Sequence, residues 1–170
     1  SEEEPITYYR VIEEINKNLD LENSIVTHDA GAPRDTIVPF FSATIPHSYI
    51  GWGKTTHLGF GIPLMIGAKM AQPEKFCLNL MGDGAFGMSG TDIETAARSG
   101  AAITTVLLNN SAMATYSGPL QDTIGEEARN RYGVSTMHGD YAKIAEGMDA
   151  IGIKVNKTGD IGPALKEAQV

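Results

Sequence analysis

The stretch Phe76-Cys77-Leu78-Asn79-Leu80-Met81-Gly82-Asp83-Gly84 decides the fold, because it joins a short apolar run to a turn of two glycines and an aspartate. The run has the length and composition of a buried parallel strand. Ile103 to Leu108 forms a second such run, and Asn109-Asn110 follows it directly. Open α/β sheets bind ligands at the carboxyl ends of their strands. We therefore predict an α/β fold with a doubly wound, mostly parallel sheet, helices on both faces, and a site where Asp83 and Asn110 meet.

The polar residues at these two strand ends suit a diphosphate held by magnesium. Carboxylate and carboxamide oxygens are hard ligands, and Mg²⁺ takes one or two of them beside water and phosphate oxygens. Gly82 and Gly84 permit a sharp turn and a close approach of the backbone to a phosphate. Gly-Asp-Gly alone is common, but here a helix and a second strand ending in Asn-Asn follow it, and that combination is specific.

On these residues, the segment from Gly82 to Asn110 resembles the signature of thiamine diphosphate (ThDP) enzymes, in the group of acetolactate synthase, oxalyl-CoA decarboxylase and 2-hydroxyacyl-CoA lyase. The resemblance continues in Gly59-Phe60-Gly61-Ile62-Pro63, in Gly67-Ala68-Lys69 and in the stretch IGPALKEA at 161–168. It covers nearly the whole chain and implies the diphosphate-binding (PP) domain of such an enzyme. The alternative is a doubly wound domain with an unrelated Gly-Asp-Gly loop.

The resemblance implies roles at the diphosphate end of the cofactor. The matching metal ligands are the side chains of Asp83 and Asn110 and the backbone carbonyl of Ala112. The positions that match diphosphate-contacting turns are Gly82, Gly84, Ala85 and Phe86 in one turn, and Gly31 and Ala32 in another. The second turn departs from acetolactate synthases, which carry polar side chains where Ala32 and Pro33 stand, and Pro33 has no N–H to donate.

At the other end of the cofactor, Leu58 matches the apolar residue that supports the folded, V-shaped conformation, and the Thr56 carbonyl matches an acceptor for the aminopyrimidine. His57, Met113 and Tyr116 match positions beside the cofactor. For His57 a polar loop residue is the alternative, and for Tyr116 substrate contact and plain loop packing remain equally open.

The activity that the resemblance implies is that of a 2-oxoacid decarboxylase or carboligase of the acetolactate synthase type. A 2-hydroxyacyl-CoA lyase or an oxalyl-CoA decarboxylase is the enzymatic alternative, with an acyl-CoA substrate bound largely outside this domain. A non-catalytic dimerisation or regulatory module is the alternative of another class, and the presence of Asp83, Asn110 and Leu58 counts against it.

The family's activating glutamate belongs to a separate pyrimidine-binding domain, on the same or a second subunit. Nothing in this chain matches that domain. We therefore expect no catalytic residue here, an inactive chain in isolation, and a homodimer or homotetramer. The group closes its sheet with a further strand after the late helix, so we also expect a single domain, 1–170, that is a fragment of a longer chain.

Composition sets the remaining limits. A chain of 170 residues with 42% hydrophobic residues can bury one core. The net charge of −8 counts against nucleic acid. No apolar stretch approaches the roughly 20 residues of a membrane span. The single cysteine, Cys77, excludes an internal disulfide, and a cytoplasmic location is expected.

The stretch at 51–56 ends like a P-loop, but Ser48 replaces its first glycine and no strand precedes it.

Local patterns predict the other elements. Helices are expected from Tyr8 to Leu19, 61–70, 141–150 and 162–168, and strands at 24–27 and 151–155. We expect an active-site loop at 34–52 and a polar loop from Asn110 to about Arg131. Ser89 and Asp92 suggest a capping box for a helix that ends at Gly100.

Overall fold

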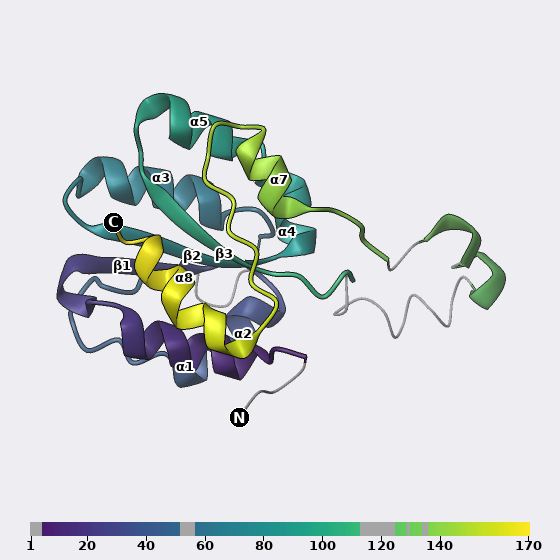
Figure 1. The fold of residues 1–170 in the computed structure, drawn as a ribbon, viewed down its shortest axis with the longest axis horizontal. Helices are drawn as coiled ribbons and strands as arrows, with labels where there is room; N and C mark the ends of the chain where they lie inside the picture. Colours follow the sequence, from purple (N-terminus) through teal and green to yellow (C-terminus); the bar gives the residue numbers. More distant parts are fainter. Residues whose placement is uncertain (1–4, 52–56, 113–124, 129, 134–135) are drawn as a thin grey trace.

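Three parallel strands form the centre of the molecule in the computed structural model, which describes residues 5–51, 57–112, 125–128, 130–133 and 136–170. The strands are β1 (Ser24–His28), β2 (Phe76–Gly82) and β3 (Ile103–Leu108), and they lie in that order (Figure 1). Ser24 is the partner of Phe76, and Gly82 is the partner of Leu108. The parallel α/β sheet predicted from the sequence is confirmed.

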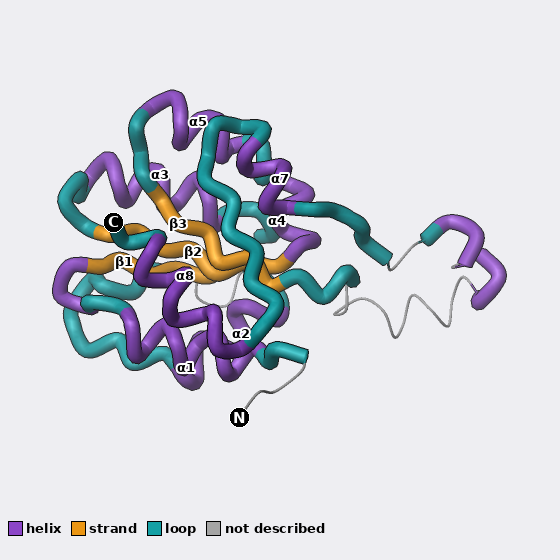
Figure 2. The backbone as a smooth tube through the Cα atoms, in the orientation of Figure 1, coloured by secondary structure: helices purple, strands orange, loops and turns teal. Residues whose placement is uncertain are grey.

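Helices cover both faces of the sheet (Figure 2). The helices of the first face are α1 (Tyr8–Asn18), α2 (Ala32–Phe40) and α8 (Ile161–Glu167). Those of the second face are α3 (Gly61–Ala71), α4 (Asp83–Ser89), α5 (Asp92–Ser99) and α7 (Tyr141–Glu146). Short 3₁₀ turns, η1 (Leu21–Asn23) and η3 (Thr158–Asp160), precede β1 and α8. None of the helices in the described ranges is long and apolar enough to cross a membrane.

The alternation of side chains along β2 explains why both faces are covered. Leu78 and Leu80 join the core beneath α1 and α8, whereas Cys77 and Met81 face the opposite layer. All four side chains are fully buried. A strand with apolar residues on both faces needs a helix layer on each side to keep them from water.

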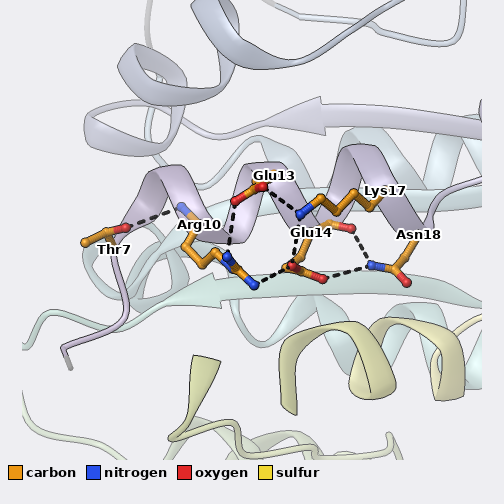
Figure 3. A network of polar contacts seen from close by, with 6 residues as sticks. All are labelled: Thr7, Arg10, Glu13, Glu14, Lys17 and Asn18. Carbon is orange, nitrogen blue, oxygen red and sulfur yellow. Dashed lines mark hydrogen bonds and ion pairs between the residues drawn. The ribbon is translucent and has the colours of Figure 1, made fainter. Parts of the chain in front are cut away.

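Helix α1 is held by a cap at its N-terminus, by apolar residues on its buried side and by ion pairs along its surface. Thr7 caps it, since its hydroxyl accepts a hydrogen bond from the Arg10 N–H at 3.3 Å. Its buried residues are Val11, Ile12 and Ile15. Ion pairs one turn apart link Arg10 and Lys17 to Glu13 and Glu14, and Asn18 bonds to Glu14 (Figure 3). Such pairs contribute only about 0.2–0.5 kcal/mol each, so burial holds α1 in place.

A polar row crosses the middle of the sheet on the face that α3 covers. Asn79 is the partner of Thr27 in β1 and of Thr105 in β3. The Asn79 side chain is fully buried, and neither its oxygen nor its nitrogen has a hydrogen-bond partner among the described residues. A Cβ at Gly61 would clash with this amide, so the glycine allows α3 to begin directly above β2.

The expectation of a loop from Arg34 to Trp52 is wrong for its first part, because residues 34–40 belong to α2. Pro33 lies in the first turn, where a missing N–H costs little. Pro39 is inside the helix but close to its end, and the Phe41 N–H still bonds to the Ile37 carbonyl at 2.8 Å. One helix therefore accommodates a proline in its first turn and another near its C-terminal end.

The strand expected at 151–155 is also absent, since these described residues belong to no strand. Ile151 is 85% exposed, and the backbone of Gly152 lies against Ala142 of α7, where a Cβ would come within 2.8 Å of a backbone atom. The segment packs on a helix and is not paired in the sheet. Helix α7 itself ends at Glu146, earlier than expected, and Gly147 follows it.

Two smaller expectations, at the start of α5 and at 125–128 and 130–132, are also corrected. Ser89 ends α4 and does not cap α5, whose N-cap is Thr91 without a side-chain hydrogen bond. The capping box fails because α4 already occupies the residues before Asp92. Residues 125–128 and 130–132 are helical, within a segment expected to be a polar loop. The predicted end at Gly100 is confirmed, with φ of 68°.

Candidate functional site

The candidate site lies where β2 and β3 end side by side. Gly82 and Leu108 are partners in the sheet, so Asp83 lies one residue beyond the end of β2 and Asn110 two residues beyond the end of β3. Helix α4 starts at Asp83, so the Gly-Asp-Gly sequence is the junction of a strand and a helix and not an extended loop. The structure therefore brings the two sequence-predicted side chains to one edge of the sheet.

Asp83 is the most unusual group at this edge. Its residue is 2% exposed, and its Oδ1 accepts a hydrogen bond from the Gly84 N–H at 2.8 Å. Its Oδ2 is buried and has no hydrogen-bond partner among the described residues. Gly84, Ala85 and Phe86 are buried next to it in α4. A buried carboxylate oxygen without a donor is costly, so this atom is suited to a cation.

The residues after β3 form a tight turn around Asn110. The Asn110 Oδ1 accepts from the Ala112 N–H at 3.0 Å, and Asn109 Oδ1 accepts from the Ser111 N–H at 3.0 Å. Ser111 has φ of 57°, a left-handed conformation that such side-chain turns accompany. Ala112 forms an isolated antiparallel bridge with Thr136. Asn110 is exposed, and its oxygen keeps a second lone pair for another partner.

Two tyrosines that the sequence reasoning missed flank Asp83. Burial raises the pKa of Tyr8, the Asp83 carboxylate raises it further, and a side-chain hydrogen bond with Asn110 lowers it. Burial and then the same carboxylate raise the pKa of Tyr141, whose ring meets that of Phe86 edge-on at 5.2 Å. Tyr8 begins α1, and its place in a helical apolar pattern indicated only a core role.

The second predicted turn lies beside the first. Gly31 has φ of 82° and precedes α2, and a Cβ at Gly82 would come within 3.8 Å of Pro33. Gly31 and Ala32 therefore stand at the same edge of the sheet as Gly82. His28 is buried before this turn, its Nδ1 3.0 Å from the Asp29 carbonyl oxygen, and burial lowers its pKa.

Asp29 links this turn to the segment that precedes α3. It is 1% exposed, and its Oδ1 accepts from the N–H groups of Ala30 at 2.8 Å and Gly59 at 2.9 Å. Its Oδ2 accepts from the Gly61 N–H at 2.9 Å. The sequence showed only an aspartate in a polar turn. Partners 30 and 32 residues away could not be found from local patterns.

Leu58 lies in the segment that Asp29 holds. It is half-buried and packs against a cluster of Ile62, Met81, Ala85 and Phe86, which joins α3 to the start of α4. Gly59 follows with φ of 89°. His57 is exposed. Thr56, Met113 and Tyr116 lie outside the described residues.

The donor set at this edge has a clear chemical preference. Within the described ranges, no group of three or more histidines, cysteines, aspartates or glutamates could enclose a metal. One carboxylate and one carboxamide remain, which suits a cation that takes most of its ligands from water and phosphate, such as Mg²⁺. The unpaired Asp83 oxygen fits such an ion, and the fold and the site together define an α/β domain of the cofactor-binding class.

Comparison with known proteins gives the particular family. Residues 29–169 match the family described as "Thiamine pyrophosphate enzyme, C-terminal TPP binding domain". The chain belongs to this family, and the resemblance inferred from the sequence is confirmed.

Two curated relatives illustrate the range of the family. The mitochondrial acetolactate synthase catalytic subunit of Saccharomyces cerevisiae is 29% identical over 144 residues, which are 84% of this chain and 20% of that protein. The sulfoacetaldehyde acetyltransferase of Castellaniella defragrans is 29% identical over 162 residues, 94% of this chain and 26% of that protein. The chain thus spans about a quarter of the length of these relatives.

A solved structure supports the fold. The ThDP-dependent 4-hydroxybenzoylformate decarboxylase of Rhodococcus jostii RHA1 superposes with a TM-score of 0.80 over 99% of this chain and 32% of that chain, at 22% identity. At this identity the likeness shows a shared fold.

Proposed function

We propose that this chain binds the diphosphate of ThDP through Mg²⁺ and forms part of a 2-oxoacid decarboxylase or carboligase resembling acetolactate synthase. The observation that carries the proposal is the buried Asp83 Oδ2, which lacks a donor among the described residues, at the strand end next to Asn110. Membership of the family supports ThDP as the cofactor.

The metal ligands of the proposal are the Asp83 carboxylate, the Asn110 carboxamide and the Ala112 carbonyl. Asp83 is the anionic ligand of the set and contributes the largest electrostatic attraction to a divalent cation. The turn at Asn110 and Ala112 is already closed by the hydrogen bond between them, so little order would be lost on binding. Gly31, Ala32, Gly82, Gly84, Ala85 and Phe86 complete the proposed diphosphate end.

ThDP, when bound, supplies a thiazolium carbon that adds to a carbonyl and an electron-accepting ring that permits the adjacent C–C bond to break. The residues of this chain anchor and shape the cofactor. Leu58 would support the folded conformation of the cofactor by contact. The resemblance to the family assigns the Thr56 carbonyl to the aminopyrimidine, and His57, Met113 and Tyr116 to positions beside the cofactor. The group that activates the pyrimidine is a glutamate of a pyrimidine-binding domain, so this chain alone is inactive.

The substrate class in this proposal is a small 2-oxoacid. The named relatives include a synthase and an acetyltransferase, and the structural neighbour is a decarboxylase. These activities have in common the making or breaking of a bond next to a carbonyl carbon. An acyl-CoA substrate is the second candidate, as in 2-hydroxyacyl-CoA lyase or oxalyl-CoA decarboxylase. A cytoplasmic homodimer or homotetramer belongs to the same proposal.

Calorimetric titration of ThDP into the complete protein tests the proposal. We expect binding that requires Mg²⁺ and disappears with a chelator. A complete protein that binds ThDP equally well with and without a divalent cation would contradict the assigned role of Asp83 and Asn110. Turnover of pyruvate and other 2-oxoacids, compared with oxalyl-CoA and 2-hydroxyacyl-CoA, then separates the two substrate classes.

A further inference from the structure

We infer that Asp29 is a positioning residue that fixes the Leu58 segment to the diphosphate end of the site. This inference rests on the proposed function for its catalytic consequence, while its structural part concerns hydrogen bonds that exist without cofactor. Asp29 acts through Leu58 and does not itself touch the cofactor in this account.

The geometry around Asp29 is that of a clamp. One buried carboxylate accepts three backbone hydrogen bonds, of 2.8 to 2.9 Å, from Ala30, Gly59 and Gly61. Both of its oxygens are used, and the Asp29 N–H donates to the Leu80 carbonyl at 2.7 Å. The residue is therefore anchored to β2 through its backbone while its side chain holds a segment 30 residues further along the chain.

The clamped segment has a backbone conformation that depends on glycine. Gly59 has φ of 89°, a conformation that favours glycine, and a Cβ there would lie 3.1 Å from Met88 and 3.2 Å from Ser89. The side chain of Phe60, the N-cap of α3, makes no capping hydrogen bond. Asp29 takes over the capping of α3 from outside the helix, because it accepts the Gly61 N–H in the first turn.

The position of Leu58 depends on this clamp. Leu58 precedes the first clamped N–H by one residue and packs against the cluster that joins α3 to α4. The same carboxylate holds the Ala30 N–H, immediately before Gly31. Asp29 thus sets the spacing between the turn proposed for the diphosphate and the side chain proposed to shape the cofactor. A displacement of about 1 Å in a reacting group can cost roughly a hundredfold in rate.

The first experiment uses the complete protein without cofactor. Asp29→Asn keeps the shape of the side chain but turns one acceptor into a donor that faces backbone N–H groups. We expect amide hydrogen exchange at Gly59 and Gly61 to accelerate by roughly tenfold or more, the size of effect expected when a hydrogen bond to a charged group is lost. Exchange at Leu80 in β2 should stay slow. Asp35→Asn is the matched control, since Asp35 is exposed on α2 and its ion pair among the described residues is with its neighbour Arg34.

The second experiment measures ThDP binding and steady-state kinetics on the same variants. Asp29→Asn should lower kcat by about tenfold or more and change the ThDP dissociation constant by less than about threefold, because the metal ligands are untouched. The losses of kcat in Asp29→Asn and Leu58→Ala should not add in the double variant, since both changes disturb the Leu58 segment. Gly59→Ala strains the same segment with Asp29 in place and should give the same split between kcat and affinity.

These outcomes separate the inference from the proposed function. Unchanged exchange at Gly59 and Gly61 in Asp29→Asn, or an additive double variant, overturns the role of Asp29 even in an active ThDP enzyme. A complete protein that binds no ThDP overturns the proposed function, and accelerated exchange in Asp29→Asn would then still support the clamp.

Discussion

Asp29 and Asp83 occupy equivalent places at the ends of neighbouring strands, yet their surroundings are opposite. Both follow directly on a parallel strand, and they are 1% and 2% exposed. Asp29 uses both oxygens to hold three backbone N–H groups, whereas Asp83 holds only the N–H of its own neighbour and leaves Oδ2 without a described donor. The first carboxylate is satisfied by the protein, and the second is left for a ligand.

The largest expected effect concerns Asp83. Asp83→Ala should reduce Mg²⁺-dependent ThDP affinity by about a hundredfold or more, because it removes the anionic ligand of the proposed site. The free energy of unfolding should stay the same or rise by about 1 kcal/mol, since a buried and incompletely paired charge is removed. Calorimetry and urea unfolding of the complete protein measure the two effects. Unchanged ThDP affinity would remove Asp83 from the metal site.

Asp29→Ala should show the reverse pattern in stability. Three buried N–H groups lose their acceptor, so we expect the free energy of unfolding to fall by about 3 kcal/mol or more. Urea unfolding beside Asp83→Ala gives the comparison directly, and Asp35→Ala, at an exposed site, should stay within about 0.5 kcal/mol of the parent protein. Equal losses in the free energy of unfolding for Asp29→Ala and Asp83→Ala would show that the different hydrogen bonding of the two carboxylates does not affect stability.

Leu58→Ala tests the Leu58 segment, which Asp29 holds and which packs against the start of α4 beside Asp83. The proposed anchor of metal and diphosphate is untouched, so ThDP affinity should fall only modestly. Turnover should fall further, by about tenfold to a hundredfold, because loss of the apolar contact would let the proposed folded conformation of the cofactor shift by about 1 Å. Steady-state kinetics with a ThDP titration decide the matter. A normal kcat combined with lost affinity would identify Leu58 as a binding or core residue.

The smallest effect is expected from pH, through His28 next to Asp29. Burial lowers the pKa of His28 from its ordinary value of 6.5. Below that pH the unfolded chain takes up a proton that the folded protein does not, so stability is present above pH 6.5 and is lost as the pH falls. Urea unfolding between pH 5 and 8 should show a weaker pH dependence in His28→Gln than in the parent protein. An identical dependence would show that His28 does not contribute.

Sequence patterns predicted the parts of the fold that are locally encoded. The apolar runs of β2 and β3, the periodic face of α1 and the left-handed Gly100 could each be read within a few residues. Helix α2 was missed because Pro39 looks like a helix breaker until the end of the helix is known. The segment 151–155 was misassigned because an alternation of apolar residues does not show whether the segment pairs with an edge of the sheet or packs against a helix.

The candidate site divides in the same way. Asp83 and Asn110 were predictable because each follows its own strand and because parallel strands end at one edge. Tyr8 was not, since a residue that reaches the site from the start of α1 looks like any other core position in a helical pattern. The role of Asp29 depends on its hydrogen bond with Gly59, 30 residues away, which local sequence patterns cannot predict.

Asn79 bears on how a newly made chain reaches this structure. If β2 docked one residue out of step with β1 and β3, every side chain along it would change faces. The Asn79 amide would no longer lie next to Thr27 and Thr105. It would instead be buried among the aliphatic side chains beneath α1. In the native register the amide already lacks a hydrogen-bond partner among the described residues, so the shifted register would differ by losing the neighbouring hydroxyls and the space that Gly61 leaves for the amide. Asn79 in β2 thus favours the native register of the sheet over the shifted one.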